Sequence, residues 1–312
     1  HKINPVGAQH FSGFSAAGPK TPSQATRSAH THTHTKLEPM VASAAVERAL
    51  GYPYPRPSSS FLFRPGRGAR PFPCREWPGI GGLPGFLGAD GSPTDGCAAW
   101  TPVLAIGSNA SPQQLERKFP AALFPDATIP AIKGRLRGFD VAYAPLLSSY
   151  GSVTATLEHS PVCTVEVFVT YLEASLLERM HATEGGYDLV TLDDVRLELG
   201  NGEVLTQVAQ YNHQRGTLHV PVGDEPGPVA LAEIPAVGRE FPARTQREMQ
   251  EFVHGFLGAE GEFGDKYVLE NLEDDDTRKA RVETLLQAAK PFRYEKAVVQ
   301  KTLGSMFDKQ VK

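Results

Sequence analysis

The stretch that most constrains the fold is a short apolar run that ends in a glycine turn and leads into a helix start. Val103–Ile106 is typical of a buried strand, and Gly107-Ser108-Asn109 follows it directly. Ser111 is suited to cap a helix, Pro112 to occupy its first turn, and Gln114 to complete a capping box. Backbone N–H groups and the helix dipole meet at such a corner, so it can hold an anion. An ordinary strand–turn–helix corner explains the same residues.

Charge and cysteine content exclude several classes of function. A net charge of −4 over 312 residues leaves no basic footprint for nucleic acid. Three widely spaced cysteines, Cys74, Cys97 and Cys163, argue against a disulfide scaffold and a four-cysteine zinc site, and they favour a reducing compartment. No apolar run approaches the roughly 18 residues of a membrane span, and the start lacks the layout of a signal peptide. We therefore expect a cytoplasmic protein with no nucleic-acid partner and no membrane partner.

Changes in composition along the chain predict four segments. Residues 1–50 are expected to form a disordered leader, in which only 41–50 can form a short helix. Residues 51–100 are rich in Pro, Gly and aromatic side chains, which favours an irregular arm that packs on the main domain. A disordered leader explains the composition of this arm equally well. Residues 101–275 are expected to form the main domain, and 276–312 a C-terminal helical extension.

The pattern of the main domain predicts the α+β class. Alternation predicts strands at 139–143, 151–157, 163–171, 193–199 and 204–211, and helical spacing predicts helices at 113–119, 173–182, 244–257 and 277–289. Gly200-Asn201-Gly202 is typical of a hairpin turn, and the acidic residues 273–276 suit the start of the helix at 277–289. Several antiparallel strands with an inserted helix favour a small, strongly curved mixed β-sheet or barrel with flanking helices.

A second landmark, Ala182 to Tyr187, lies where the helix at 173–182 is expected to end. Gly185 and Gly186 can adopt a positive φ and stop the helix. The carboxylate of Glu184, beside such a turn and close to strands and an aromatic side chain, is suited to proton transfer. A surface glutamate near a helix end explains the same residue.

Together these segments resemble the gamma-glutamyl cyclotransferase-like family, which shares its fold with the plant AIG2-like proteins. The family's glycine-serine-asparagine loop stands here as Ile106–Asn109, and its helix that ends in a catalytic glutamate stands as Leu177–Gly185. The stretch 244–272 is similar to the family's closing helix and turn. The resemblance covers about 103–272 and implies a gamma-glutamyl cyclotransferase-like fold and an enzyme of the lyase or acyltransferase type.

The resemblance also implies a reaction on a small-molecule γ-glutamyl substrate. The substrate's own α-amino group attacks its γ-carbonyl, closes the lactam 5-oxoproline and releases an amine or peptide. It implies no metal and no cofactor, because the nucleophile belongs to the substrate. Glu184 would act as the acid and base, and Gly107, Ser108 and Asn109 would hold a substrate oxygen with backbone N–H groups.

The chain departs from the family pattern in the first loop. Ile106 stands where the family has tyrosine, and Ala110 stands where it has a bulky residue. Tyr187 either restores an aromatic hydroxyl at the site or packs in the core. The residues expected to bind the substrate are Ile106, Gly107, Ser108, Asn109 and Tyr187. A catalytically silent small-molecule-binding module of the same fold is the alternative. The retained Glu184 disfavours this alternative, and the lost tyrosine favours it.

Other chemistries fit the sequence less well. Ser108 is not in a Gly-x-Ser-x-Gly elbow, and its candidate base His181 falls inside a predicted helix. Cys163 lies in the middle of a predicted strand, where buried structural thiols are common. His213 and His219 lack the neighbouring cysteine or acidic residues of a zinc site.

Overall fold

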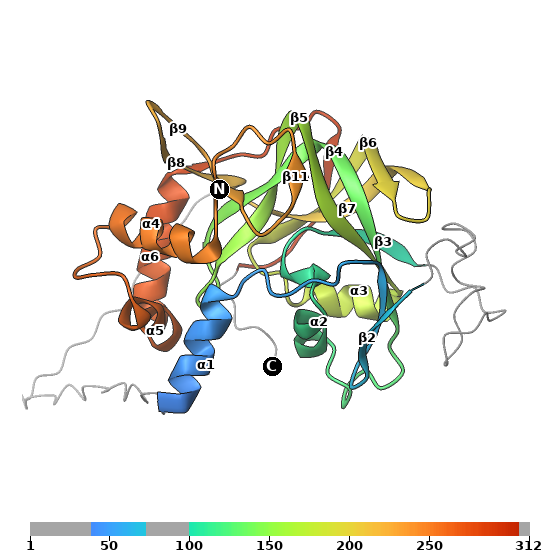
Figure 1. Cartoon of the computed structure of the whole chain (residues 1–312), viewed down its shortest axis with the longest axis horizontal. Coiled ribbons are helices and arrows are strands. Elements are labelled where there is room, and N and C mark those ends of the chain that lie inside the picture. Colours follow the sequence, from blue (N-terminus) through green and yellow to red (C-terminus); the bar gives the residue numbers. More distant parts are fainter. Residues whose placement is uncertain (1–38, 73–99, 306–312) are drawn as a thin grey trace, which may run out of the picture. The chain divides into compact units, whose positions relative to one another are not determined.

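The computed structural model describes residues 39–72 and 100–305. Its helices are α1 Pro39–Leu50, α2 Pro112–Lys118, α3 Ala174–His181, α4 Gln246–Phe256, α5 Asp265–Glu273 and α6 Asp275–Gln287, with a short 3-10 helix, η3, at Ser108–Ala110 (Figure 1). The larger sheet contains β1 Phe61–Arg64, β2 Gly68–Pro71, β3 Thr101–Ala105, β4 Ile129–Leu147, β5 Val153–Leu172, β6 Tyr187–Leu199, β7 Val204–His213, β10 Ala230–Leu231, β11 Ala236–Val237, β12 Ala243–Arg244 and β14 Ala297–Thr302. A smaller sheet contains β8 Thr217–Val222, β9 Glu225–Pro228 and β13 Ala289–Lys290.

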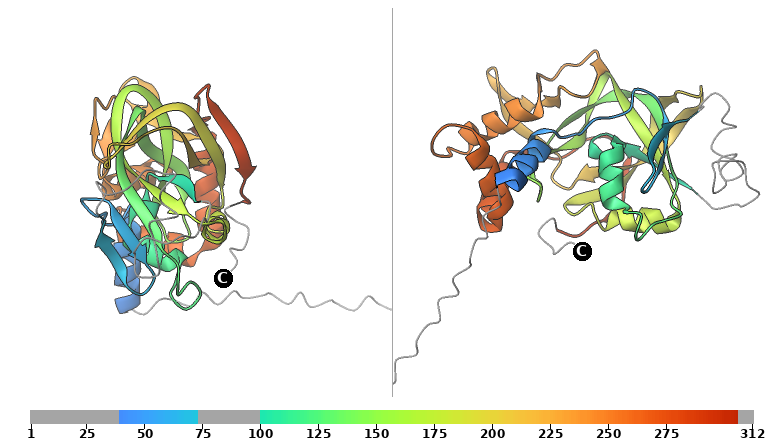
Figure 2. Two further views of the ribbon diagram at one scale, coloured as in Figure 1. Left: turned by 90° about the vertical axis from the view of Figure 1, so that its right-hand side faces the viewer. Right: turned by 60° about the horizontal axis from the view of Figure 1, so that its bottom comes forward.

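Five strands of the described chain close into a barrel, which Figures 1 and 2 show from three directions. β5 pairs with β3, β3 with β7, β7 with β6, β6 with β4, and β4 again with β5. Only the β3–β7 pair of this ring is parallel, so the sheet is mixed. The predicted α+β class, with a strongly curved mixed sheet or barrel and flanking helices, is confirmed.

The two longest strands, β4 and β5, differ from the sequence prediction. The sequence predicted separate strands at 151–157 and 163–171, but β5 runs without interruption over 20 residues. Its pairing with β4 shifts register between Arg137 and Phe139, where β5 continues through 160–163. The break in alternation that indicated two strands is therefore an irregularity inside one bent strand.

The arm forms more regular structure than the sequence predicted. β1 and β2 form a hairpin, and β1 pairs with β4 at the edge of the sheet. Tyr52, Tyr54, Phe61, Phe63 and Phe72 are buried in the main hydrophobic core. These contacts explain the high aromatic content of residues 51–72, whereas residues 73–99 lie outside the described part of the chain.

α1 forms at Pro39–Leu50, where the sequence predicted a short helix at 41–50 within the expected leader. Val46 and Ala49 of α1 are buried in a small cluster with Tyr267 and Val268 of α5. The energy of burying this apolar face stabilises a helix that would be marginal alone. Residues 1–38 lie outside the described part of the chain.

The C-terminal extension is helical only in its first part, which corrects the prediction for 276–312. Asp274 caps α6 by accepting hydrogen bonds from the backbone N–H groups of Asp276 and Thr277, as the acidic turn predicted. Beyond α6 the chain adds β13 and β14, and β14 pairs antiparallel with β6. β-Branched residues in 297–302 favour a strand there. The division into four segments remains a prediction.

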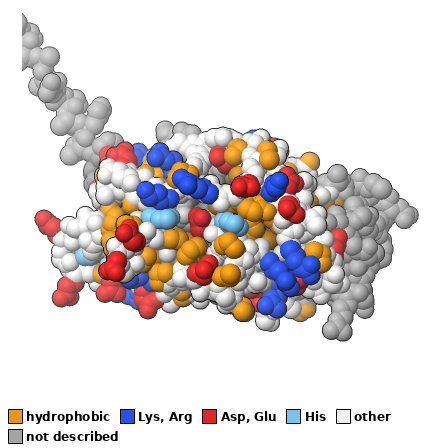
Figure 3. Space-filling view, turned by 90° about the horizontal axis from the view of Figure 1, so that it is seen from above, with side chains coloured by type: hydrophobic (Ala, Val, Ile, Leu, Met, Phe, Trp, Pro, Cys, Tyr) orange, Lys and Arg blue, Asp and Glu red, His pale blue; other side chains and the backbone are white. Residues whose placement is uncertain are grey.

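Figure 3 shows the face of the molecule that lies uppermost in Figure 1. Hydrophobic side chains on it are interspersed with acidic and basic ones, and Lys and Arg side chains gather at two places.

Within residues 39–72 and 100–305, no helix has both the length and the apolar character needed to cross a membrane.

Candidate active site

The predicted corner of strand, turn and helix is present, but its capping differs from the prediction. β3 ends at Ala105, η3 follows, and α2 begins at Pro112. Ser111 occupies the N-cap position, yet its side chain caps no backbone N–H group, so the predicted capping box with Gln114 is wrong. The Gln114 side chain instead accepts a hydrogen bond from Arg117, at 3.2 Å.

Close packing leaves no room for a side chain at Gly107. A Cβ at this position would lie 2.3 Å from the hydroxyl oxygen of Tyr52 and 3.2 Å from the Cβ of Ala155. The Tyr52 hydroxyl accepts a hydrogen bond from the Ala155 backbone N–H at 3.0 Å. Tyr52, from the segment after α1, thus lies directly on the predicted anion loop.

The turn that carries Glu184 has the geometry expected from its glycines. α3 ends at His181, and Gly186 adopts a φ of 87°. The backbone N–H of Tyr187 donates to the carbonyl of Glu184 at 3.1 Å, which closes the turn just before β6 begins. Glu184 therefore projects from a short turn between α3 and the barrel.

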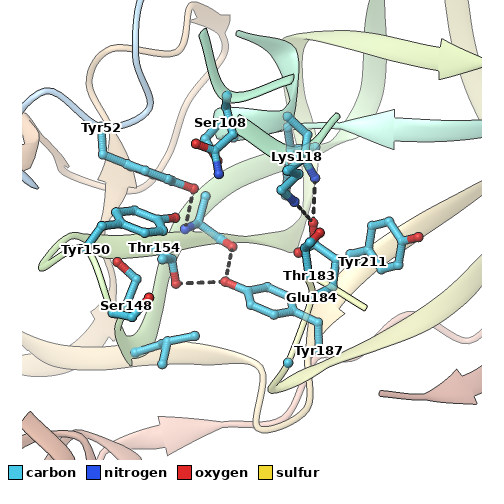
Figure 4. A pocket seen from close by; sticks show the side chains of 18 of the residues that line it. Tyr52, Ser108, Lys118, Ser148, Tyr150, Thr154, Thr183, Glu184, Tyr187 and Tyr211 are labelled. Atoms are coloured by element: carbon cyan, nitrogen blue, oxygen red, sulfur yellow. Dashed lines mark hydrogen bonds and ion pairs between the residues drawn. The ribbon is translucent and has the colours of Figure 1, made fainter. Parts of the chain in front are cut away.

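One cavity of about 110 Å³ brings all the predicted site residues together, as Figure 4 shows in part. Those residues are Ile106, Gly107, Ser108, Asn109, Glu184 and Tyr187. Tyr52 and Tyr150 lie toward one side of the view, and Lys118 and Glu184 toward the other. The individual roles expected for these residues remain proposals.

Glu184 is held by two partners that both contact the same carboxylate oxygen. Asn109 donates from Nδ2 to Oε1 at 2.9 Å, and the Lys118 ammonium forms an ion pair with Oε1. The side chains of Lys118 and Glu184 are only 8% and 11% exposed. In the described chain, Oε2 accepts no hydrogen bond, so this oxygen is available to take up a proton.

The neighbouring helices fix the position of Lys118. Arg179 of α3 donates to the Lys118 backbone carbonyl at 2.9 Å, and the Lys118 ammonium lies 3.4 Å from the sulfur of Met180. Sequence reasoning missed this lysine, although it was detectable. Lys118 follows Leu115 by three positions and precedes Phe119, and both of these are fully buried, so a cation falls on the buried face of α2.

Three tyrosine hydroxyls border the cavity. The Tyr187 hydroxyl lies 2.7 Å from the Thr154 hydroxyl, to which it donates, and 3.0 Å from the Ala155 carbonyl. Burial raises the pKa of Tyr52, Tyr150 and Tyr187 above that of an exposed phenol. The three phenols therefore stay protonated at neutral pH and can serve as hydrogen-bond donors.

The cavity also has polar groups with no partner in the described chain. The buried side-chain oxygens Asn109 Oδ1 and Gln210 Oε1 accept no hydrogen bond. The backbone N–H groups of Ser108 and Asn109 likewise donate to no group among the described residues. Unsatisfied buried groups cost stability, so their presence on one cavity favours a polar ligand that supplies both donors and acceptors.

The alternative chemistries gain no support from the geometry. His181 Nδ1 is hydrogen-bonded to the Tyr211 hydroxyl at 2.8 Å, and no hydrogen bond joins His181 to Ser108 in the described chain. Cys163 is buried, and burial raises the pKa of its thiol to about 12, so it is not a reactive thiolate. Residues 39–72 and 100–305 contain no group of three His, Cys, Asp or Glu side chains arranged to hold a metal ion.

Comparison with known proteins gives distant structural neighbours. No family model and no curated protein matches the sequence. Similar solved structures include a gamma-glutamyl cyclotransferase, with 15% identity, a TM-score of 0.30, and coverage of 63% of this chain and 91% of that one. An uncharacterized human protein has 15% identity, a TM-score of 0.29, and coverage of 62% and 90%.

A solution structure from Arabidopsis thaliana has 19% identity, a TM-score of 0.28 and coverage of 36% of this chain. This chain spans 62% of the Arabidopsis chain, which is slightly less than two thirds. Identities and TM-scores at this level establish no reaction, so the function is inferred from the site itself.

Proposed function

We propose that this protein releases 5-oxoproline from a small γ-glutamyl compound by intramolecular aminolysis, with Glu184 as the acid and base. The observation that carries the proposal is the position of the Glu184 carboxylate. It is nearly buried, it is held at Oε1 by Asn109 and Lys118, and its Oε2 atom is unpaired within the described chain. A carboxylate held in this way has one oxygen for positioning and one for proton transfer.

The proposed reaction needs no nucleophile from the protein. Glu184 takes a proton from the substrate's α-ammonium, and the resulting amine attacks the γ-carbonyl carbon. The new C–N bond closes a five-membered ring as the bond to the leaving nitrogen breaks. Glu184 gives its proton to that nitrogen and then takes the second proton that the ring nitrogen must lose. This second proton passes to the released amine, which leaves as an ammonium ion, so atoms and charges balance. Holding the flexible glutamyl chain in a folded shape accelerates such a ring closure by proximity.

The remaining cavity groups match this substrate. The unpaired acceptors Asn109 Oδ1 and Gln210 Oε1 suit an ammonium or an amide N–H. The backbone N–H groups of Ser108 and Asn109 suit a carboxylate or the oxygen that becomes negative during attack. Ile106 and Tyr187 would form the walls that position the glutamyl carbons, in keeping with their place on the cavity.

A second candidate function is a catalytically silent module that binds a small molecule in the same cavity. One observation favours it: the carboxylate proposed as a base is already neutralised by Lys118. In this alternative Lys118 and Glu184 are structural partners, and the cavity binds a γ-glutamyl compound without converting it.

Turnover measured alongside binding separates the two candidates. The intact protein is incubated with a panel of γ-glutamyl amino acids, amines and peptides, and 5-oxoproline is quantified while calorimetry measures the binding of each compound and of 5-oxoproline. The proposal predicts catalytic release of 5-oxoproline from at least one compound. Binding without any release would support the silent module, and neither binding nor release would contradict both.

A further inference from the structure

The hydroxyl group of Tyr52 belongs to the wall of the central cavity, although Tyr52 comes from the segment that follows α1 (Figure 4). It lies against the Gly107 turn, where a Cβ on Gly107 would be 2.3 Å from the hydroxyl oxygen. The next two residues of this turn, Ser108 and Asn109, carry the backbone N–H groups that have no acceptor in the described chain. One side-chain hydroxyl and two backbone N–H groups therefore lie close together at the cavity.

The Tyr52 hydroxyl has a proton to donate and no acceptor for it among the described residues. Its oxygen accepts a hydrogen bond from the Ala155 backbone N–H at 3.0 Å, and no hydrogen bond within residues 39–72 and 100–305 has this hydroxyl as the donor. Burial raises its pKa well above that of an exposed phenol, so the proton stays on the oxygen at neutral pH. Tyr187 differs, because its hydroxyl already donates to Thr154 at 2.7 Å.

Several contacts fix the position of the Tyr52 hydroxyl in the absence of a ligand. The carbonyl of Ala49, in the last turn of α1, accepts hydrogen bonds from Ser152 Oγ at 2.8 Å and from Gln250 Nε2 at 3.3 Å. The Tyr52 ring is buried and contacts the Tyr54 ring edge-on, with 6.0 Å between ring centres. A donor held in this way loses little entropy when it binds a ligand, which is the condition for electrostatic preorganisation.

We propose that Tyr52 is a catalytic residue whose hydroxyl donates a hydrogen bond to the γ-carbonyl oxygen of the substrate. The inference rests on the proposed function and adds a side-chain donor to it. As the α-amine attacks the γ-carbonyl carbon, the π electrons of the carbonyl move onto its oxygen, and the hydroxyl stabilises this negative charge together with the N–H groups of Ser108 and Asn109. The C=O double bond forms again as the bond to the leaving nitrogen breaks, and Tyr52 keeps its proton throughout.

Tyr52→Phe removes the hydroxyl and keeps the ring, and its kinetics with the best γ-glutamyl compound test the role. We expect kcat to fall by about 10²–10³-fold, the scale of removing one oxyanion donor. KM should rise by no more than about fivefold, because the neutral carbonyl of the bound substrate loses only an ordinary hydrogen bond. A kcat within about threefold of the wild type, with or without a raised KM, would overturn the catalytic role while the proposed reaction stands.

Tyr54→Phe is the matched control. Tyr54 is buried in the same segment, but it is not among the described residues that line the cavity. Loss of its hydroxyl should leave kcat within about twofold of the wild type. Tyr52→Phe leaves the Ala155 N–H without its acceptor, so it should lower stability by about 1 kcal/mol and still fold. Thermal melting and circular dichroism establish that both variants are folded at the temperature of the assay.

A second measurement reports the contact without turnover. Infrared difference spectra of bound 5-oxoproline, with and without ¹³C at the lactam carbonyl, give the stretching frequency of that carbonyl. Loss of the Tyr52 hydroxyl should raise this frequency, and loss of the Tyr54 hydroxyl should leave it unchanged. If the wild type converts no γ-glutamyl compound, the proposed reaction and the catalytic role both fail. A shift confined to Tyr52→Phe would then support the contact alone, and an unchanged frequency would overturn the contact as well.

Discussion

Lys118 and Glu184 form an ion pair at the wall of the central cavity, although 66 positions separate them in the sequence. Lys118 ends α2, and Glu184 lies in the turn that follows α3. The pair therefore joins the two landmarks that the sequence indicated separately. Its low exposure makes the pair energetically significant, because screening by water is limited at such a site.

A double-mutant cycle with Lys118→Met and Glu184→Gln measures this coupling. Lys118→Met leaves the nearly buried Glu184 carboxylate without its cation, and Glu184→Gln leaves the Lys118 ammonium with a hydrogen-bond acceptor but no opposite charge, so each should destabilise the fold. The two together should cost less than the sum, with a coupling free energy of about 1–3 kcal/mol from urea unfolding. The exposed pair Lys266–Glu270, with Lys266 92% exposed, serves as the control and should couple by no more than about 0.5 kcal/mol. Equal coupling at the two pairs would contradict the assignment.

The contact between Tyr52 and Gly107 predicts a second non-additive pair. Gly107→Ala places a methyl group against the Tyr52 hydroxyl and should destabilise the protein by about 1–3 kcal/mol through overpacking. Tyr52→Phe removes the oxygen at 2.3 Å and leaves the nearest ring carbon at 3.3 Å, so it should recover part of that loss. Thermal melting of both singles and the double variant checks this. Strict additivity would show that the hydroxyl does not limit the size of residue 107.

His213 predicts a loss of stability in mild acid. Burial lowers the pKa of His213 to about 4, from an ordinary value of 6.5. Below pH 6.5 the unfolded chain binds a proton at His213, whereas the folded chain binds it only near pH 4. The stability that His213 contributes above pH 6.5 is therefore lost as the pH falls from 6.5 to about 4. Between pH 7 and pH 5 this group alone should cost about 2 kcal/mol.

The matched variant for this effect is His213→Gln, which cannot titrate. Its stability should be lower than that of the wild type at pH 7, because a buried ring is replaced, but its loss between pH 7 and pH 5 should be smaller by about 2 kcal/mol. Urea unfolding at the two pH values measures the difference. An identical pH dependence in both proteins would mean that His213 titrates normally in the fold.

The ion pair of Asp140 and Arg239 should stabilise the barrel far more than the exposed pairs do. The Asp140 side chain is fully buried, and Arg239 contacts its two oxygens at 2.8 and 2.9 Å. Arg239→Ala leaves this carboxylate buried without its partner and should cost about 3–5 kcal/mol. Arg137→Ala breaks a pair with Glu198 in which Arg137 is 55% exposed, and should cost less than about 1 kcal/mol. Similar losses in the two variants would contradict this ranking.

The sequence predicted the parts of the fold that depend on local pattern. The hairpin around 200–203, the helix before Glu184 and the acidic cap of α6 follow from turn residues, helical spacing and capping, and all are present. The sequence predicted a strongly curved sheet or barrel, but not which strands pair to close it. The pairing of β3 with both β5 and β7 depends on contacts between distant segments, which periodicity does not record.

The candidate site was only partly predictable for the same reason. Turn residues and the family motifs indicated Gly107, Asn109 and Glu184. Tyr52 comes from the segment before β1, and no local sequence pattern indicates that it lies at the site. Ile106 stands where the family has tyrosine, so the sequence indicated that a phenolic hydroxyl is missing there. The Tyr52 hydroxyl lies beside the neighbouring Gly107, supplied by a segment that has no part in the resemblance. A short helix at 41–50 was predictable from the sequence, but its burial against α5 was not, because that contact joins segments far apart in the chain.

The most direct test of the central claim is the rate at which Glu184→Gln forms 5-oxoproline. Glutamine keeps the size of the side chain and an acceptor for Asn109 and Lys118, but it cannot exchange a proton at neutral pH. We expect a folded variant that still binds 5-oxoproline and whose turnover of the best γ-glutamyl compound is lower by at least about 10²-fold. Glu251→Gln, which changes an exposed glutamate of α4, should stay within about twofold of the wild type. A folded Glu184→Gln protein that turns over the same compound as fast as the wild type would contradict the assignment of Glu184 as the acid and base.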